Sequence, residues 1–357
     1  MQWRIVGLGD VPDLARGRKT TMFLHIQLDA RPDRAADRAR ELAAAGIDGL
    51  FTFEGQHDVF LPLAAAAATT DVELMTNVAI ALPRSPLHLA HAAYDLQLLS
   101  HGRFRLGLGS QIRPHIESRY GSTWSRPAAR MRETVLAIRA IFDAWQHRTR
   151  LEFRGEFTKH TLMPPSFSPG PNPFGMPPIY LGALGPVMTR TAAEVADGLL
   201  VMPFHSVRHF RERTLPAVDA GLDRAGRTRA DLDIVPQVIA AMGRTDEELA
   251  AATAGVRTLL AFYGSTPAYV PVLEVEGRAA LQPELNALSK RMEVDAMAGL
   301  IDDDILTTVA VRGTPEECAD AIAGRFGDVA RRVCVYFPGY DVALDHVRDL
   351  AESLHRR

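Results

Sequence analysis

The stretch Arg103-Phe-Arg-Leu-Gly-Leu-Gly-Ser-Gln111 has the pattern of a strand that opens into a binding loop. Phe104, Leu106 and Leu108 alternate with arginine and glycine, which is the two-residue period of a strand. Glycines at its end let a ligand approach the backbone closely, as at the carboxyl ends of strands in α/β enzymes. Because the stretch lacks the third glycine of a dinucleotide fingerprint, tight strand-to-loop packing is the alternative interpretation.

Strand-like and helical segments alternate on both sides of this stretch. The predicted strands are 22–28, 49–53, 73–80, 103–109, 179–182, 198–202, 233–242 and 332–337. The predicted helices are about 31–45, 61–69, 86–99, 126–145, 186–196, 207–225, 245–262 and 342–355, with one more starting at the capping-box pattern of Thr314. Eight βα units predict a single α/β domain over 1–357, a (β/α)8 TIM barrel with its chemistry on the loops after the strands. An open doubly wound sheet is the rival fold, but no complete glycine fingerprint supports it.

Two long insertions interrupt the alternation, at about 113–178 after the fourth strand and 264–312 after the seventh. The first is rich in proline and glycine over 150–178, which is typical of a lid or a packed surface loop. The second contains two predicted helices, near 282–290 and 292–301.

The composition narrows the classes of function. A formal net charge of −3 leaves no basic footprint, so neither nucleic acid nor an anionic membrane is an expected partner. Cys318 and Cys334 are too few for a disulfide framework or a zinc site, which fits a reducing cytoplasm. The adjacent carboxylates of Asp302–Asp304 lack metal-ligand spacing, so we expect no metal there. The chain begins with a strand-like Trp3–Val6 rather than the apolar run of a signal peptide, and no stretch is long enough to span a membrane.

Several stretches resemble the bacterial luciferase-like monooxygenase superfamily, and together they cover most of the chain in register. They are Leu98-Leu-Ser-His-Gly-Arg-Phe-Arg-Leu-Gly-Leu-Gly109, Gly46-Ile-Asp-Gly-Leu-Phe-Thr-Phe-Glu54, Met75-Thr-Asn-Val78 with Arg84-Ser-Pro86, and Ala193-Glu-Val-Ala-Asp-Gly198. Three more stretches, 109–117, 160–163 and 261–269, resemble one branch, the deazaflavin (coenzyme F420)-dependent oxidoreductases of actinobacteria. The resemblance implies a barrel with a flavin-type ring in its mouth and a small-molecule substrate, often in a homodimer.

The loop after the second strand carries the acid–base candidates that the resemblance implies. Family members often have a histidine directly after the acidic residue that corresponds to Glu54, but here that position is Gly55 and the histidine is His57. An imidazole with an ordinary pKa of ~6.5 suits proton exchange during hydride transfer, so His57 and Glu54 are the predicted catalytic residues. The alternative is a surface cluster that caps the next helix.

The resemblance also implies which backbone holds the ring and the phosphate of the cofactor. At Thr76-Asn77-Val78, family members carry a bulged, non-proline cis peptide behind the ring, where an ordinary buried strand is the alternative. The strand-to-helix turn before Pro186 corresponds to the phosphate site, because free N–H groups at a helix N-terminus attract anions. The predicted cofactor-binding residues are Thr76, Asn77, Val78, Gly109, Ser110, Gln111, Gly182, Ala183, Leu184 and Gly185.

Three residues are predicted to contact substrate: His115, His205 and Tyr263. For each of them packing is the alternative interpretation. Sugar-phosphate dehydrogenases of the family place a catalytic glutamate where this chain has Ile112, which argues against a sugar phosphate as the substrate.

Three functions remain open from the sequence. The first is an F420-dependent oxidoreductase that transfers a hydride between the deazaflavin and an organic substrate. The second is an FMN-dependent two-component monooxygenase, which would need a flavin reductase as partner. The third is a non-catalytic flavin-binding barrel. F420 carries a long acidic tail whereas FMN ends in one phosphate, so Arg84, Arg113 and Arg119 favour F420 if they lie free at the barrel mouth.

Overall fold

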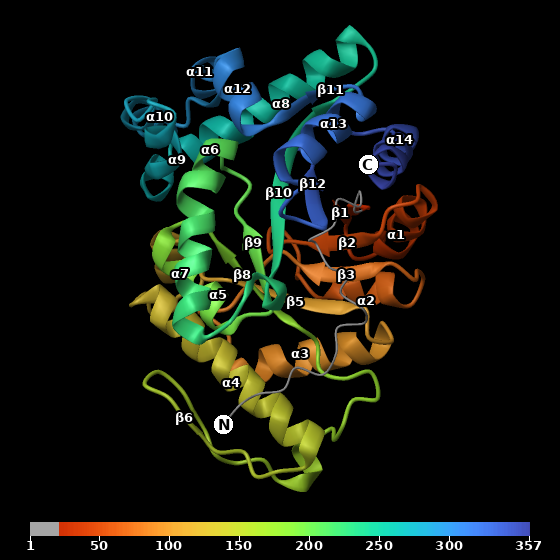
Figure 1. Cartoon of the computed structure of the whole chain (residues 1–357), viewed down its shortest axis with the longest axis vertical. Helices are drawn as coiled ribbons and strands as arrows, with labels where there is room; N and C mark the ends of the chain where they lie inside the picture. The colour runs from red at the N-terminus through yellow and green to blue at the C-terminus, as the bar shows by residue number, and fades with distance from the viewer. Residues whose placement is uncertain (1–20) are drawn as a thin grey trace.

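A computed structural model describes residues 21–357, whose parallel strands close into a barrel surrounded by helices (Figure 1). Each strand pairs with the next, and β12 returns to pair with β1, so the sheet is closed and the doubly wound alternative is excluded. The barrel strands are β1 Phe23–Gln27, β2 Gly49–Thr52, β3 Glu73–Thr76, β5 Phe104–Gly109, β8 Ile179–Ala183, β9 Gly198–Val201, β10 Asp233–Met242 and β12 Arg332–Tyr336. A short β4, Ala79–Ile80, continues beyond β3 and pairs with β5. The predicted (β/α)8 barrel is confirmed; the segment Trp3–Val6 lies outside the described residues.

The helices that cover the barrel lie within a few residues of their predicted bounds. They are α1 Ala35–Ala44, α2 Leu61–Ala67, α3 Pro86–Leu99, α4 Pro127–His147, α5 Pro186–Val195, α7 Leu215–Ala225, α8 Asp246–Gly264, α13 Pro315–Phe326 and α14 Leu344–His355. Local capping explains several starts: Thr314 and Glu317 form a capping box at α13, and the Ser85 hydroxyl accepts the Leu87 N–H at α3. A short α6, Val207–His209, and a π-helical turn, Phe210–Thr214, lead into α7.

The two insertions contain the two helices predicted near 282–290 and 292–301, seen as α10 and α11, together with short elements that the sequence did not predict. The first holds a π-helical turn, His115–Arg119, and a hairpin of β6 Phe153–Arg154 and β7 Lys159–His160. The second holds α9 Val270–Val275, α10 Leu281–Lys290, α11 Val294–Gly299, α12 Asp303–Val309 and β11 Val311–Gly313. These are short elements whose stability comes from tertiary contacts rather than from periodicity. Asp302 accepts the Ile305 N–H and so caps α12.

The hairpin shows how such a short element is held. The Glu133 carboxylate of α4 accepts backbone N–H groups from Glu156, Phe157 and Thr158 at 2.6–2.8 Å. A Cβ on Gly155 would stand 2.2 Å from that carboxylate, so the turn requires glycine at this position. The Glu133 carboxylate, which is distant in the sequence, therefore stabilises this short hairpin in place of the many contacts of a longer one.

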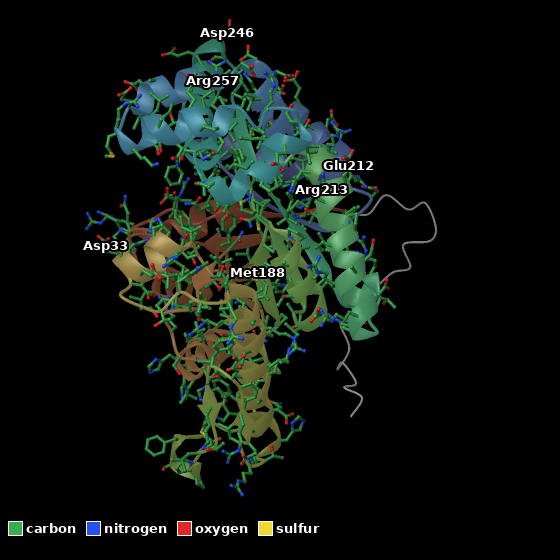
Figure 2. All side chains as sticks on the ribbon, turned by 90° about the vertical axis from the view of Figure 1, so that its left-hand side faces the viewer. Asp33, Met188, Glu212, Arg213, Asp246 and Arg257 are labelled. Atoms are coloured by element: carbon green, nitrogen blue, oxygen red, sulfur yellow. The ribbon has the colours of Figure 1, made fainter. Side chains whose placement is uncertain are left out.

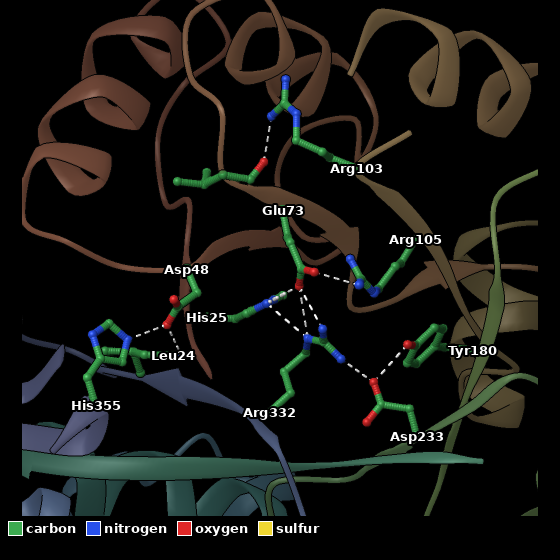
Figure 3. A network of polar contacts seen from close by, with 11 residues as sticks. Leu24, His25, Asp48, Glu73, Arg103, Arg105, Tyr180, Asp233, Arg332 and His355 are labelled. Atoms are coloured by element: carbon green, nitrogen blue, oxygen red, sulfur yellow. Dashed lines mark hydrogen bonds and ion pairs between the residues drawn. The ribbon is translucent and has the colours of Figure 1, made fainter. Parts of the chain in front are cut away.

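The amino-terminal end of the barrel is filled by charged side chains (Figure 3). Arg332 of β12 donates to Glu73 at 2.8 Å and also pairs with Asp233, while Arg105 donates to the other oxygen of Glu73 at 2.6 Å. His25 lies 2.9 Å from Glu73, and burial lowers its pKa to about 4. Two carboxylates and two guanidinium groups neutralise each other, so this end of the barrel is a plug rather than an opening.

Glycines make room for the rings at this end of the barrel. A Cβ on Gly49 would stand 2.5 Å from the His25 ring, and a Cβ on Gly198 would stand 2.1 Å from the Tyr180 ring. The next layer towards the carboxyl ends is apolar and contains Phe51, Met75, Tyr180, Leu200, Val235 and Cys334. The main core lies between strands and helices, and no helix among residues 21–357 is long and apolar enough to cross a membrane.

Candidate functional site

A bulge between β3 and β4 lies at the carboxyl end of the barrel. The Asn77–Val78 peptide is cis, as the resemblance implies. Thr76 secures the bulge, because its hydroxyl donates to the Gly107 carbonyl at 2.7 Å and accepts the Gly107 N–H at 2.9 Å. The Thr76 hydroxyl is therefore occupied by β5, and only its backbone remains for a cofactor.

The Val78 side chain lies over a floor of glycines. A Cβ on Gly109 would stand 2.4 Å from Val78 Cγ2, and a Cβ on Gly182 would stand 3.1 Å from Val78 Cγ1. The inward-facing positions of β5 and β8 near this end thus carry no side chain next to Val78. The Val78 side chain therefore packs directly against β5 and β8, and we call Val78 with these two glycines the flat bed.

Three polar residues lie close together next to the bulge: Tyr336, Gln237 and Asn77. Tyr336 and Gln237 were not predicted from the sequence, and Asn77 was predicted only as part of the backbone that holds the cofactor. Tyr336 of β12 donates to the Gln237 side chain of β10, and its hydroxyl lies 3.5 Å from the Asn77 carbonyl. Burial, with smaller contributions from Cys334 and Tyr263, raises the pKa of Tyr336 well above its usual value. The buried Asn77 amide has no partner among the described residues apart from the Cys334 sulfur, a weak acceptor.

Unsatisfied amide atoms in a buried position are costly, and they indicate a missing ligand or water. Tyr336 and Gln237 follow the two-residue alternation that faces them into the barrel. That alternation could have identified them as lining residues, once the strands were assigned.

Glu54 lies in the loop that follows β2, and its buried carboxylate holds several elements together. Its carboxylate accepts the Ile80 N–H at 2.8 Å, Arg84 at 2.6 Å and the Tyr120 hydroxyl at 2.9 Å, with the side chain 8% exposed. It therefore joins the β2 loop to β4, to the start of α3 and to the first insertion. With every contact made to a donor, Glu54 is suited to hold a loop rather than to release a proton.

His57 has the opposite environment. It is exposed and has no hydrogen-bond partner among residues 21–357. The neighbouring Asp58 accepts the Phe60 and Leu61 N–H groups and so caps α2, which leaves His57 without the capping role. A Cβ on Gly55 would stand 2.7 Å from the Phe53 ring, so a histidine at position 55 would displace that ring.

The loop after β5 turns back on itself. Gln111 has a left-handed φ of 58°, and its side-chain oxygen accepts the N–H of Ile112. The Ser110 hydroxyl donates to the Gln111 carbonyl at 3.2 Å, and His115 begins the following π-helical turn, partly exposed and without a side-chain hydrogen bond among the described residues. Ser110 and Gln111 thus bond within their own loop.

The turn after β8 ends at Gly185, which precedes the first residue of α5. Pro186 has no N–H, so the free donors of the first turn are Val187 and Met188. Among the described residues, nothing lies within 4 Å of a Cβ built on Gly185, so this turn is not covered at that position. This is the geometry of an anion site.

The residues predicted for substrate separate into two environments. Tyr263 at the end of α8 lies in an aromatic cluster with Phe204 and Tyr269, with ring centroids 5.9 and 6.0 Å away. Tyr263 and Tyr269 pack in the same apolar cluster as Ile239 and Ala241 of β10, so this cluster adjoins the carboxyl-terminal part of that strand. His205 is buried between Phe210 and Phe326 and binds the Met202 carbonyl, which places it in packing.

The three arginines expected to favour an acidic cofactor are largely engaged within the protein. Arg84 pairs with Glu54 and Arg113 pairs with Glu117, while Arg119 donates to the Gly55 carbonyl at 2.8 Å. Arg84 and Arg113 are therefore neutralised by neighbouring carboxylates. These three arginines therefore give little support for a cofactor with an acidic tail.

Comparison with known proteins gives a consistent family assignment. The family described as luciferase-like monooxygenase matches residues 15–332. An uncharacterised protein of Mycobacterium tuberculosis is 48% identical over 305 residues, covering 85% of this chain and 90% of the relative. A second protein of that organism, named a putative coenzyme F420-dependent oxidoreductase, is 31% identical over 298 residues, covering 79% of this chain and 84% of its own.

Solved structures share the fold. The coenzyme F420-dependent tetrahydromethanopterin reductase of Methanopyrus kandleri aligns with a TM-score of 0.74 at 18% identity, covering 94% of this chain and 98% of that one. The EDTA monooxygenase of Chelativorans aligns with a TM-score of 0.65 at 17% identity, covering 94% of each chain. At such identities the likeness concerns the fold alone.

Proposed function

Since the chain belongs to the luciferase-like monooxygenase family, we propose that it is an oxidoreductase that uses coenzyme F420 as its hydride carrier. The substrate is a small organic molecule. The relative named a putative coenzyme F420-dependent oxidoreductase supports the choice of cofactor, and the resemblance of the loop after β5 supports it independently.

The observation that carries this proposal is the flat bed at the carboxyl end of the barrel. Val78, Gly109 and Gly182 leave a surface without projecting side chains, and the unsatisfied Asn77 amide lies beside it. Both features fit a planar heterocycle that has polar atoms along its edge. The α5 N-terminus supplies free N–H groups for a phosphate on the same side of the barrel.

The residues of the chain have distinct roles in the proposed reaction. The deazaflavin, when bound, supplies or accepts the hydride. The bulge positions the ring, Glu54 holds the β2 loop, and His57 gives or takes the proton that accompanies hydride transfer to or from a carbonyl or an alkene. Tyr263 and its aromatic neighbours line the substrate end.

We further propose that the chain works in the cytoplasm and forms a homodimer. Light scattering would test the homodimer.

Titration with the two cofactors tests the proposal directly. We expect F420 to bind the purified protein with micromolar affinity or better, and FMN to bind at least about tenfold more weakly, followed by cofactor fluorescence. Tenfold corresponds to about 1.4 kcal/mol of binding free energy. Tighter binding of FMN would favour a two-component monooxygenase that depends on a flavin reductase. Binding of neither cofactor would favour a barrel without flavin chemistry.

The phosphate site has a sharper test because Gly185 tolerates a side chain. Gly185→Asp should weaken F420 binding more than about tenfold, since it places a negative charge at the anion site of α5. Gly185→Ala is the matched control and should bind normally, because nothing lies within 4 Å of its Cβ and φ is −71°. Equal affinity of the two variants would locate the phosphate elsewhere.

A further inference from the structure

A groove runs over the outer face of α5, between α4 and α7. Its floor is formed by successive turns of α5, from Val187 to Glu194, and its walls carry Arg132 of α4 and Arg224 of α7. Figure 2 labels Met188 on this helix. The groove is open on one side and has a volume of about 340 Å³, the low end of the range for ligand sites.

The groove carries a net positive charge. It contains three guanidinium groups, from Arg132, Arg190 and Arg224, and one carboxylate, from Glu194. Glu194 lies 3.5 Å from both Arg132 and Arg224, which is long for a charged hydrogen bond. Arg190 is partly buried and has no carboxylate partner among the described residues. An anionic ligand would supply the missing partner.

The position of the groove connects it to the phosphate site. Val187, one of the two residues with a free N–H in the first turn of α5, also lines the groove. Arg190 follows one turn later on the same face of the helix, because residues three apart are neighbours on a helix surface. An acidic chain that leaves a phosphate at the α5 N-terminus would therefore meet Arg190 within about one helical turn, ~5.4 Å.

We propose that this groove binds the acidic tail of the deazaflavin cofactor, with Arg190 as its principal contact and Arg132 and Arg224 at its sides. The inference rests on the proposed F420 chemistry and adds a site outside the barrel mouth. It also restores a charge argument for F420, since Arg84 and Arg113 are already paired within the protein. Glu194 competes with the tail for the same arginines.

The test compares F420 with a form of the coenzyme cut back to its phosphate, using wild-type protein and variants of the groove. In low salt, full-length F420 should bind wild type about fivefold or more tightly than the truncated form. Arg190→Glu should remove this difference and leave the affinity for the truncated form within about twofold. Glu194→Gln should increase the advantage of the full tail. The effect should shrink with added salt, because exposed charges are screened.

Arg208→Ala is the matched control, since Arg208 of α6 is an exposed arginine, paired with Glu212 of the following π-helical turn, and lies outside the groove. It should retain the preference of wild type for the full tail. Equal affinity of wild type for the two forms, or an unchanged preference in Arg190→Glu, would overturn the groove proposal while F420 binding itself still stands. Failure of both forms to bind would overturn the cofactor assignment and the groove together.

Discussion

His57→Ala should lower turnover by roughly 100-fold or more while cofactor affinity changes by less than about threefold. The size of the effect is that of general acid–base catalysis, which typically contributes 10²–10⁴-fold. His57 is exposed and free of internal hydrogen bonds among the described residues, so its loss leaves no buried partner unsatisfied. Steady-state kinetics with a substrate found by screening, together with a fluorescence titration of F420, separates the two quantities.

Glu54→Gln provides the comparison for this experiment. The amide retains the shape of the carboxylate, but its nitrogen cannot accept hydrogen bonds, so one of the Glu54 partners Ile80, Arg84 and Tyr120 loses its acceptor. We expect a smaller loss of turnover than for His57→Ala, accompanied by a lower melting temperature. Normal turnover of His57→Ala with an inactive but folded Glu54→Gln would reverse the roles and make Glu54 the acid–base residue.

Stability should fall steeply between pH 6.5 and pH 4. Burial lowers the pKa of His25, His205 and His209 to about 4, whereas an unfolded histidine titrates near 6.5. In this window the unfolded chain binds protons that the folded chain does not, so the contribution is complete above pH 6.5 and is lost as the pH falls. Each histidine accounts for about 1.4 kcal/mol per pH unit, and all three for about 4.

By pH 4 this slope removes roughly 9 kcal/mol from a total stability that is typically about 5–15 kcal/mol, so the urea midpoint should fall sharply by pH 4. Urea unfolding at a series of pH values measures the slope. His205→Gln can keep a donor to the Met202 carbonyl and should reduce the slope by about 1.4 kcal/mol per pH unit. His147→Gln, at an exposed residue of α4, is the control and should leave the slope unchanged. An unaltered slope in His205→Gln would show that the protonation of His205 does not drive the unfolding.

Much of the fold was predictable because its signals are local. The alternation in 103–109 predicted β5, and apolar spacing over 126–145 predicted α4 to within a few residues. Thr314 and Glu317 predicted the start of α13, since a capping box needs only four consecutive residues. The hairpin at 153–160 was missed because Glu133, about twenty residues earlier, holds its turn.

The candidate site was predictable in its location and less so in its details. Loops after parallel strands were correctly expected to meet at one end of the barrel. A side chain at that end can contact a cofactor or a substrate only where it is not already bonded to, or packed within, the protein. Thr76 is bonded to β5, Glu54 is enclosed by three donors, and His205 is buried among aromatic rings. Strand alternation could have placed Tyr336 and Gln237 on the inside of the barrel, but the contact between them depends on the pairing of β10 with β12, which the sequence does not show.

The sequence by itself determined the order of strands and helices, the closed barrel and the family, because these depend on periodicity, on capping and on motifs of adjacent residues. The tertiary structure alone decided the cis peptide at Asn77–Val78, the partners of Glu54, the charge plug around Arg332 and the groove over Arg190. The last three join segments separated by tens or hundreds of residues. Their geometry and charge balance exist only once the barrel has brought those segments within a few ångströms of one another.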